Sequence, residues 1–195
     1  LAGWLFVLAL LSKESAAAIP PVCLIILLFN SPGIPLNIEK DRKRTTGILF
    51  CVLAGYLYLR FSLLKHPLDS LTNFHGGSFF SNLINVPRSY MLALWKFLLP
   101  VSLAPDYPLS FWNEQLFWAG ACLLILIISA IALAFNRRER FPLITFGFLG
   151  FVTIFSVTAN WIPIPQFFGE RYLYLPGALL SIAAGSFLDR ILTSI

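Results

Sequence analysis

The sequence predicts an all-α, polytopic helical membrane protein, and its composition is the first reason. Of 195 residues, 58% are hydrophobic and only 12% are charged, with a mean hydropathy of +0.80. Soluble domains carry about 25% charged residues, so this chain has too few charges to coat a soluble globule. The abundant Phe, Leu and Ile and the small number of cysteines exclude disordered, collagen-like and disulfide-scaffold proteins.

The distribution of the apolar residues is the second reason, because they gather in runs separated by short polar segments. The first run, residues 1–11, has no basic segment before it and no small-residue cleavage site, which argues against a signal peptide. We interpret it as the end of a spanning helix. The sequence is thus expected to be a fragment of a larger multi-spanning protein, with residues 1–195 forming a single membrane domain.

The later runs approach the length of about 20 residues that a spanning helix needs. A helix over 16–29 is expected to be kinked or delayed by Pro20 and Pro21. The run 89–104 is the weakest, because it carries Lys96 and Pro100. The remaining expected helices cover residues 46–64, 115–135, 143–158 and 172–188.

Two basic segments set the expected sidedness. They are loops 39–44 and 136–141, which contain Lys40, Arg42, Lys43 and Arg44, and Arg137, Arg138 and Arg140. The positive-inside rule places both loops in the cytoplasm. Two loops on the same side must be separated by an even number of membrane-spanning helices, but three apolar runs lie between these loops. We therefore predict about six spanning helices and one re-entrant or interfacial helix, the run 89–104.

This topology collects most of the other charged residues on the outer face. The outer segments are residues 12–14, 65–88, 106–107 and 160–171. Lys13 and Glu14 form either a tight solvated turn, with Glu14 favouring a helix N-terminus, or part of a functional site. Asp106 and Tyr107 form either a turn between prolines or one side of a substrate cleft.

The most distinctive string is Gly-Glu-Arg-Tyr-Leu-Tyr-Leu-Pro at residues 169–176. Arg171 is expected at a helix N-terminus, where it could bind a phosphate bidentately. Glu170 could orient this arginine or contact a sugar hydroxyl. Tyr172 and Tyr174 are candidates for contact with substrate, but an interfacial aromatic belt is the better explanation of tyrosines at such a position.

Other chemistries find no support in the sequence. Cys23, Cys51 and Cys122 lie in apolar runs, and His66 and His75 have no zinc-binding spacing, so no metal site is predicted. There is no nucleotide-binding glycine motif and no basic–aromatic strip for nucleic acid. The net charge of +5 is therefore assigned to the loops of a membrane protein.

Three strings occur in an order that resembles a known family. They are LLSKESAAAIP, FLLPVSLAPDYP and GERYLYLPGALL. Together they resemble the membrane portion of the transmembrane and tetratricopeptide-repeat proteins, which are similar to the protein O-mannosyltransferase-like GT-C glycosyltransferases. The resemblance runs from residue 12 to residue 180.

The resemblance implies a multi-pass enzyme in a bacterial inner membrane or the endoplasmic reticulum, active in protein glycosylation. It would transfer a mannose-like sugar from a polyprenyl-phosphate carrier to a protein or glycan acceptor on the outer or lumenal face. Lys13, Glu14, Asp106, Glu170 and Arg171 would lie at the rim of the active site, with Arg171 and Lys13 on the lipid phosphate. The catalytic acidic residue is expected upstream of Leu1 and the tetratricopeptide repeats downstream of Ile195. No cofactor is indicated, and a divalent-metal requirement stays open.

Two alternatives remain. A transporter would need ionisable residues near helix centres, for which Arg60 and Lys96 are the candidates. A non-catalytic membrane anchor for a repeat domain would tolerate loss of Glu170 and Arg171. The lipid-linked polysaccharide ligases and polymerases, a related enzyme class, also use outer-face arginines, so these residues do not distinguish the two enzyme classes.

Overall fold

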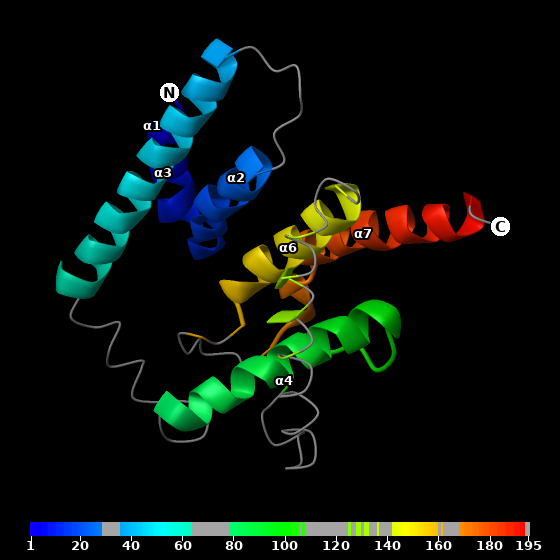
Figure 1. Ribbon diagram of the computed structural model, residues 1–195. Helices are drawn as coiled ribbons and strands as arrows, with labels where there is room; N and C mark the ends of the chain where they lie inside the picture. Colours follow the sequence, from blue (N-terminus) through cyan, green and yellow to red (C-terminus); the bar gives the residue numbers. More distant parts are fainter. Residues whose placement is uncertain are drawn as a thin grey trace. The chain divides into compact units, whose positions relative to one another are not determined.

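The computed structural model confirms the all-α class (Figure 1). It describes residues 1–28, 36–63, 79–105, 107, 125, 128–129, 131–132, 136, 142–159, 161 and 168–193. The α-helices in this part of the chain are α1 (Ala2–Ser12), α2 (Ile19–Leu28), α3 (Leu36–Leu63), α4 (Phe79–Leu98), α6 (Pro142–Ser156) and α7 (Tyr174–Thr193). Two 3-10 helices, η1 (Glu14–Ala18) and η4 (Glu170–Tyr172), precede α2 and α7. The chain divides into two compact units, Leu1–Leu68 and Asp69–Ile195.

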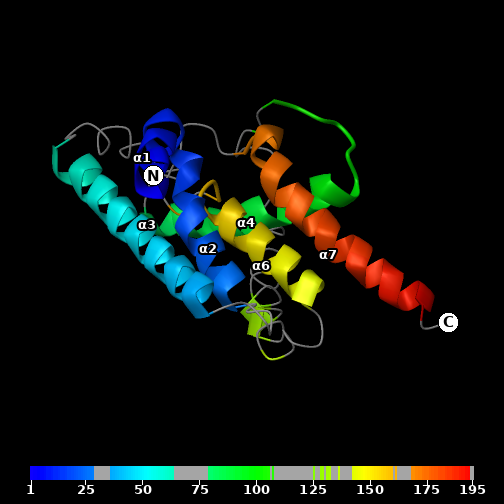
Figure 2. The same ribbon diagram turned by 90° about the horizontal axis from the view of Figure 1, so that it is seen from above.

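In the first unit, α1 and α2 pack against α3, as both views show (Figures 1 and 2). The buried side chains of Phe6, Leu10 and Leu49 form the centre of this packing. Pro20 and Pro21 lie in the first turn of α2, where a missing backbone N–H costs no helical hydrogen bond. The start of α2 at Ile19, three residues later than expected, follows from the 3-10 helix before it.

The third helix begins ten residues before its expected start at residue 46. The basic segment 39–44, expected to be a loop, belongs to α3. Lys and Arg are good helix formers, and Lys43 pairs with Glu39 one turn earlier at 2.5 Å. The loop prediction was wrong because charge was taken as a sign of irregular structure. The second basic loop, 136–141, lies almost wholly outside the described residues, as does most of the expected helix 115–135.

In the second unit, α6 and α7 lie side by side as a helix pair (Figures 1 and 2). Their bounds match the expected helices 143–158 and 172–188 to within a few residues. The helices approach closely because α6 presents Gly147 and Gly150 to α7. A Cβ at Gly150 would lie 2.6 Å from Cδ1 of Leu179, and one at Gly147 would lie 2.8 Å from the backbone nitrogen of Ala183.

The helix expected at 89–104 is α4, which begins ten residues earlier and ends six residues earlier than expected. The second half of the expected outer loop 65–88 is therefore helical, and Pro87 lies inside the helix. The helix ends at Leu98, because the residue before Pro100 is disfavoured in the α conformation. The expected bounds were wrong because Pro87 and its polar neighbours look like loop residues in the sequence.

The core of the second unit is aromatic. The Tyr90 ring of α4 meets the Phe155 ring of α6 edge-on at 4.9 Å between centroids. The Tyr90 hydroxyl donates to the Val152 carbonyl oxygen at 3.0 Å. Phe151, Phe155 and Phe168 are fully or almost fully buried. This core fixes α4 and α6 around the segment that follows α4.

By length and composition, α7 is the one helix in the described residues that could cross a membrane. The apolar helices α1 and α6 are shorter, and so is an apolar stretch from Ser15 to Leu27. The expected six spans, the re-entrant helix, the multi-pass location and the single membrane domain stay predictions.

Candidate functional site

Glu170 connects two segments that are more than 60 residues apart in the sequence. Its Oε1 accepts hydrogen bonds from the Tyr107 hydroxyl at 2.5 Å and from the Ala104 backbone N–H at 2.8 Å. The Tyr107 backbone N–H also donates to the Phe168 carbonyl oxygen at 3.0 Å. The segment after α4 is thereby fastened to the turn before α7.

Tyr107 is the centre of this junction. Its side chain is buried, and its ring meets the Phe168 ring edge-on at 5.7 Å. Its hydroxyl oxygen also accepts a hydrogen bond from the Ala104 N–H at 2.8 Å. Burial raises the pKa of Tyr107 above its usual value, and the hydrogen bond to the Glu170 carboxylate raises it further.

Lys96, in the last turn of α4, also contacts this junction. Its ammonium donates to the carbonyl oxygens of Val101 at 2.5 Å and Ser102 at 2.9 Å. It also lies 4.8 Å from the centroid of the Tyr107 ring, a cation–π contact. The residue is only 8% exposed. A buried ammonium is stable only when its protons are satisfied, and here the returning backbone satisfies them.

Two backbone features allow this arrangement. Ser102 has a φ of 53°, in the left-handed region, which is costly for a residue with a Cβ. The bend brings the two carbonyl oxygens to Lys96. Gly169 approaches the other segment so closely that a Cβ there would lie 3.0 Å from the Pro105 carbonyl oxygen.

Arg171 projects from this junction. It lies in η4, before α7, and its side chain is exposed. Its guanidinium carbon lies 5.2 Å from the centroid of the Tyr172 ring, and one of its nitrogens lies 3.3 Å from the Tyr172 hydroxyl. The expectation that Arg171 begins the α-helix itself was wrong, because η4 intervenes. The N–H groups of Tyr172 and Leu173 are used within that turn.

The other predicted site residues lie as follows. Tyr174 begins α7 and is 81% exposed. Lys13 is exposed at the end of α1, and Glu14 begins η1, both in the first unit. Asp106 lies outside the described residues, as do His66, His75 and Cys122. Within the described residues, no group of three His, Cys, Asp or Glu side chains could hold a metal ion.

The structure thus brings Tyr107 and Glu170 into contact. The sequence predicted only that both lie on the outer face of the membrane. It gives Glu170 a structural role at Oε1. Sequence reasoning missed the contact of Lys96 with this site, because it treated this lysine as a weakness of an apolar run and as a candidate residue of a transporter. A lysine four residues before a proline, at the end of such a run, is a signal that could have found it, because lysine is favourable near helix C-termini.

Comparisons with protein-family models, with curated proteins and with solved structures found no match to this chain.

Proposed function

We propose that this chain is part of an integral-membrane GT-C-type glycosyltransferase and that Arg171 binds the phosphate of a polyprenyl-phosphate sugar. One observation carries the proposal: Arg171 is exposed in η4, just before α7, and follows Glu170, whose carboxylate is hydrogen-bonded to Tyr107 and Ala104. The donor's lipid needs a membrane, and α7 meets the length and composition of a span. Its phosphate needs a cation at the membrane surface.

Exposed apolar side chains support a lipid environment. On α7, Tyr174, Leu175 and Leu192 are exposed, as are Trp4 and Leu8 on α1. Large apolar side chains that remain solvent-facing after folding indicate contact with lipid or protein. Tyr174 beside Arg171 fits the interfacial position of amphipathic aromatic residues.

In the proposed reaction, the bond between the anomeric carbon and the phosphate oxygen breaks while an acceptor hydroxyl bonds to that carbon. Negative charge grows on the departing lipid phosphate. The Arg171 guanidinium stabilises this charge through two parallel N–H···O bonds. An acidic group elsewhere in the protein takes the hydroxyl proton. Glu170, Tyr107 and Lys96 act through Arg171 as positioning residues.

A transporter needs ionisable residues near helix centres. The two candidates named for that function, Arg60 and Lys96, both lie in the last turn of their helices. Arg60 donates to the Tyr56 hydroxyl at 2.9 Å. Lys96 is held by the backbone that follows its own helix.

The test is sugar transfer from a radiolabelled polyprenyl-phosphate mannose by the full-length protein in bilayers. We expect Arg171→Ala to lower transfer by about 100-fold, the typical cost of losing one transition-state charge donor. Arg171→Lys should recover only part of the rate, because lysine cannot bind bidentately. Arg190→Ala, at the other end of α7, is the matched control and should keep the rate. Undiminished transfer by Arg171→Ala would refute the assignment of Arg171, whereas no transfer by the wild-type protein would favour a non-catalytic membrane anchor.

A further inference from the structure

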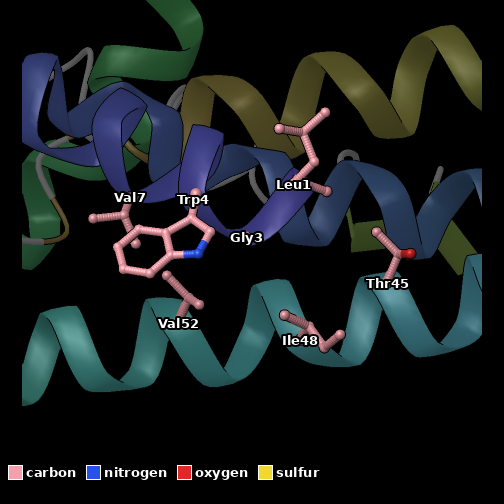
Figure 3. Close-up of a pocket in the computed structure, with 8 residues that line it drawn as sticks. Leu1, Gly3, Trp4, Val7, Thr45, Ile48 and Val52 are labelled. Atoms are coloured by element: carbon pink, nitrogen blue, oxygen red, sulfur yellow. The ribbon is translucent and has the colours of Figure 1, made fainter.

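A groove of about 570 Å³ lies between α1 and α3 in the first unit, as Figure 3 shows. Its walls include Trp4, Ile48 and Val52, and none of the described side chains that line it is charged. The groove therefore offers no side chain that would select an ionic ligand. A side chain of that kind lies in the second unit, where Arg88 of α4 is half-buried.

Asn85 occupies one end of the Arg88 guanidinium. The Arg88 Nη1 donates to the Asn85 side-chain oxygen at 3.0 Å. Asn85 is only 2% exposed and lies about one turn before Arg88 on α4, so this bond fixes the guanidinium against its own helix. The guanidinium is planar and rigid, and the direction of its other N–H groups is thereby fixed as well.

The opposite edge of this guanidinium, formed by Nε and Nη2, has no hydrogen-bond partner in the part of the chain that the structure describes. The Nε atom is buried without a partner. Nearly all buried polar atoms in folded proteins have a partner, and an exception needs an explanation such as a bound ion or a functional role. Of the two nitrogens only Nε is fully buried, so Nη2 is the one that an incoming ligand meets first.

The positive charge of Arg88 also lacks a counter-charge within the described residues. Lys96, the other cation on the buried side of α4, donates to two backbone carbonyl oxygens. Arg88 pairs with no carboxylate of the described residues, and its acceptor Asn85 is neutral. Moving a charge out of water is costly unless opposite charge and hydrogen bonds compensate for the lost water. An anion at the Nε and Nη2 edge would supply both.

We propose that the Nε and Nη2 edge of Arg88 binds a phosphate group. One guanidinium edge donates two parallel N–H···O bonds, which match two oxygens of a phosphate. Trp95 lies about two turns after Arg88 on the same side of α4 and is 54% exposed. Exposed tryptophan is typical of the membrane–water interface, where lipid phosphates and dissolved phosphate are both present.

This site does not include the junction at Glu170. Lys96, which contacts that junction, lies eight residues after Arg88, about 12 Å along the helix axis. The Arg88 site is therefore assigned a phosphate of its own. The proposal does not depend on sugar transfer at Arg171.

The experiment measures thermal unfolding of the full-length protein in phosphatidylcholine nanodiscs. Inorganic phosphate is added at constant ionic strength, because a ligand that binds only the folded protein raises its unfolding temperature. The Arg171→Ala variant serves as the background, since it removes the proposed donor site. We expect a saturable rise of the unfolding temperature that survives in this background.

Two substitutions at the site separate it from general charge effects. Arg88→Gln should raise the phosphate concentration for the half-maximal response by about 10- to 100-fold, because a bidentate, charge-assisted contact is lost. Asn85→Asp keeps an acceptor for Nη1 but puts a carboxylate beside the guanidinium, so it should weaken phosphate binding by about 10-fold. Arg190→Gln, which removes the same charge from α7, is the matched control and should keep the response. Circular dichroism should show unchanged helix content in all three.

A second series identifies the source of the phosphate group. Phosphatidic acid replaces part of the phosphatidylcholine in the nanodiscs, and no inorganic phosphate is added. A response to phosphatidic acid that inorganic phosphate does not reproduce would identify a lipid headgroup. A response to inorganic phosphate alone would identify free phosphate. Either result supports the proposal when Arg88→Gln removes it.

Three results would overturn the proposal. An unchanged response in Arg88→Gln would mean that phosphate binds elsewhere. No response to either form of phosphate would make Arg88 a structural residue of α4. A response that is lost in Arg171→Ala would assign the phosphate to the proposed donor site, which would support sugar transfer while removing the site at Arg88.

Discussion

At the scale of single residues, the strongest local feature is the hydrogen-bonded junction of Tyr107 with Glu170. The hydroxyl lies 2.5 Å from the charged Oε1 and 3.0 Å from the Ser102 carbonyl oxygen. A hydroxyl has one proton, and the carboxylate is the stronger acceptor. The bond therefore joins the two segments only while Tyr107 is protonated.

Replacing Tyr107 with Phe should cost about 1–3 kcal/mol of stability at neutral pH, since it removes a hydrogen bond to a charged group. The raised pKa of Tyr107 means that this contribution is fully present below pH 10, the usual tyrosine value, and is lost as the pH rises through the folded pKa. The difference in thermal unfolding between wild type and Tyr107→Phe in detergent should thus shrink above pH 10.

Tyr174→Phe is the matched control, because this hydroxyl belongs to a highly exposed side chain. It should unfold like the wild type at every pH. A Tyr107→Phe protein as stable as wild type at pH 7 would mean that the junction adds nothing to folding. A stability difference that persists unchanged above pH 10 would argue against the protonated tyrosine as its source.

At the scale of helices, the α6–α7 pair depends on small residues. Gly147 and Gly150 lie one turn apart on α6 and face Leu179 and Ala183 of α7. In lipid, close approach through small residues is a main source of helix association. The turn η4, which contains Arg171, lies just before α7 of this pair.

Gly147→Val should therefore separate α6 from α7 and destabilise the protein by about 1–3 kcal/mol or more, because its Cβ would overlap the backbone of Leu179 and Ala183. Gly185→Ala is the control in α7: no atom lies within 4 Å of its added Cβ. It should leave stability equal or raise it by up to about 1 kcal/mol. Thermal unfolding, monitored by size-exclusion chromatography, measures the stability of both variants. A Gly147→Val protein that unfolds at the wild-type temperature would contradict this packing.

The helix α4 shows why sequence patterns located some helices and misplaced others. Runs such as 1–11 and 143–158 contain no charged residue, so their bounds could be predicted. In α4 the buried face includes Asn85 and Ser89, and the Arg88 guanidinium donates to the Asn85 side-chain oxygen at 3.0 Å. Arg88 and Ser89 both donate hydrogen bonds to Asn85 within α4, but in the sequence these residues have the composition of a loop.

At the scale of the whole molecule, the composition predicted the all-α class, but the sequence predicted the candidate site only in part. The basic loops and the even number of membrane crossings between them predict that Tyr107 and Glu170 lie on one face. The contact between these two residues could not be predicted, because it depends on the backbone bend at Ser102. The role of Lys96 depends on the backbone after α4, which turns back so that two of its carbonyl oxygens reach the end of the helix. No local sequence pattern predicts this turn.

The predicted topology has its own test. The basic turn of α3 and the turn containing Arg171 should lie on opposite sides of the membrane, and both ends of α4 should lie on one side. In a protein with Cys23, Cys51 and Cys122 replaced by Ser, single cysteines at Lys43, Ser81, Leu103 and Arg190 report sidedness through a membrane-impermeant maleimide. We expect the Ser81→Cys and Leu103→Cys variants to react only from the outer face, and the Lys43→Cys variant only from the cytoplasmic face.

The Arg190→Cys variant decides whether α7 spans. Arg190 lies near the end of α7 opposite Arg171, so a spanning α7 exposes it on the same face as Lys43. Labelling of Ser81→Cys and Leu103→Cys from opposite sides would mean that α4 crosses, and the parity argument would fail. Labelling of Arg190→Cys from the outer face would mean that α7 lies along the membrane. The donor-phosphate proposal would then lose the helix that places Arg171 at its surface.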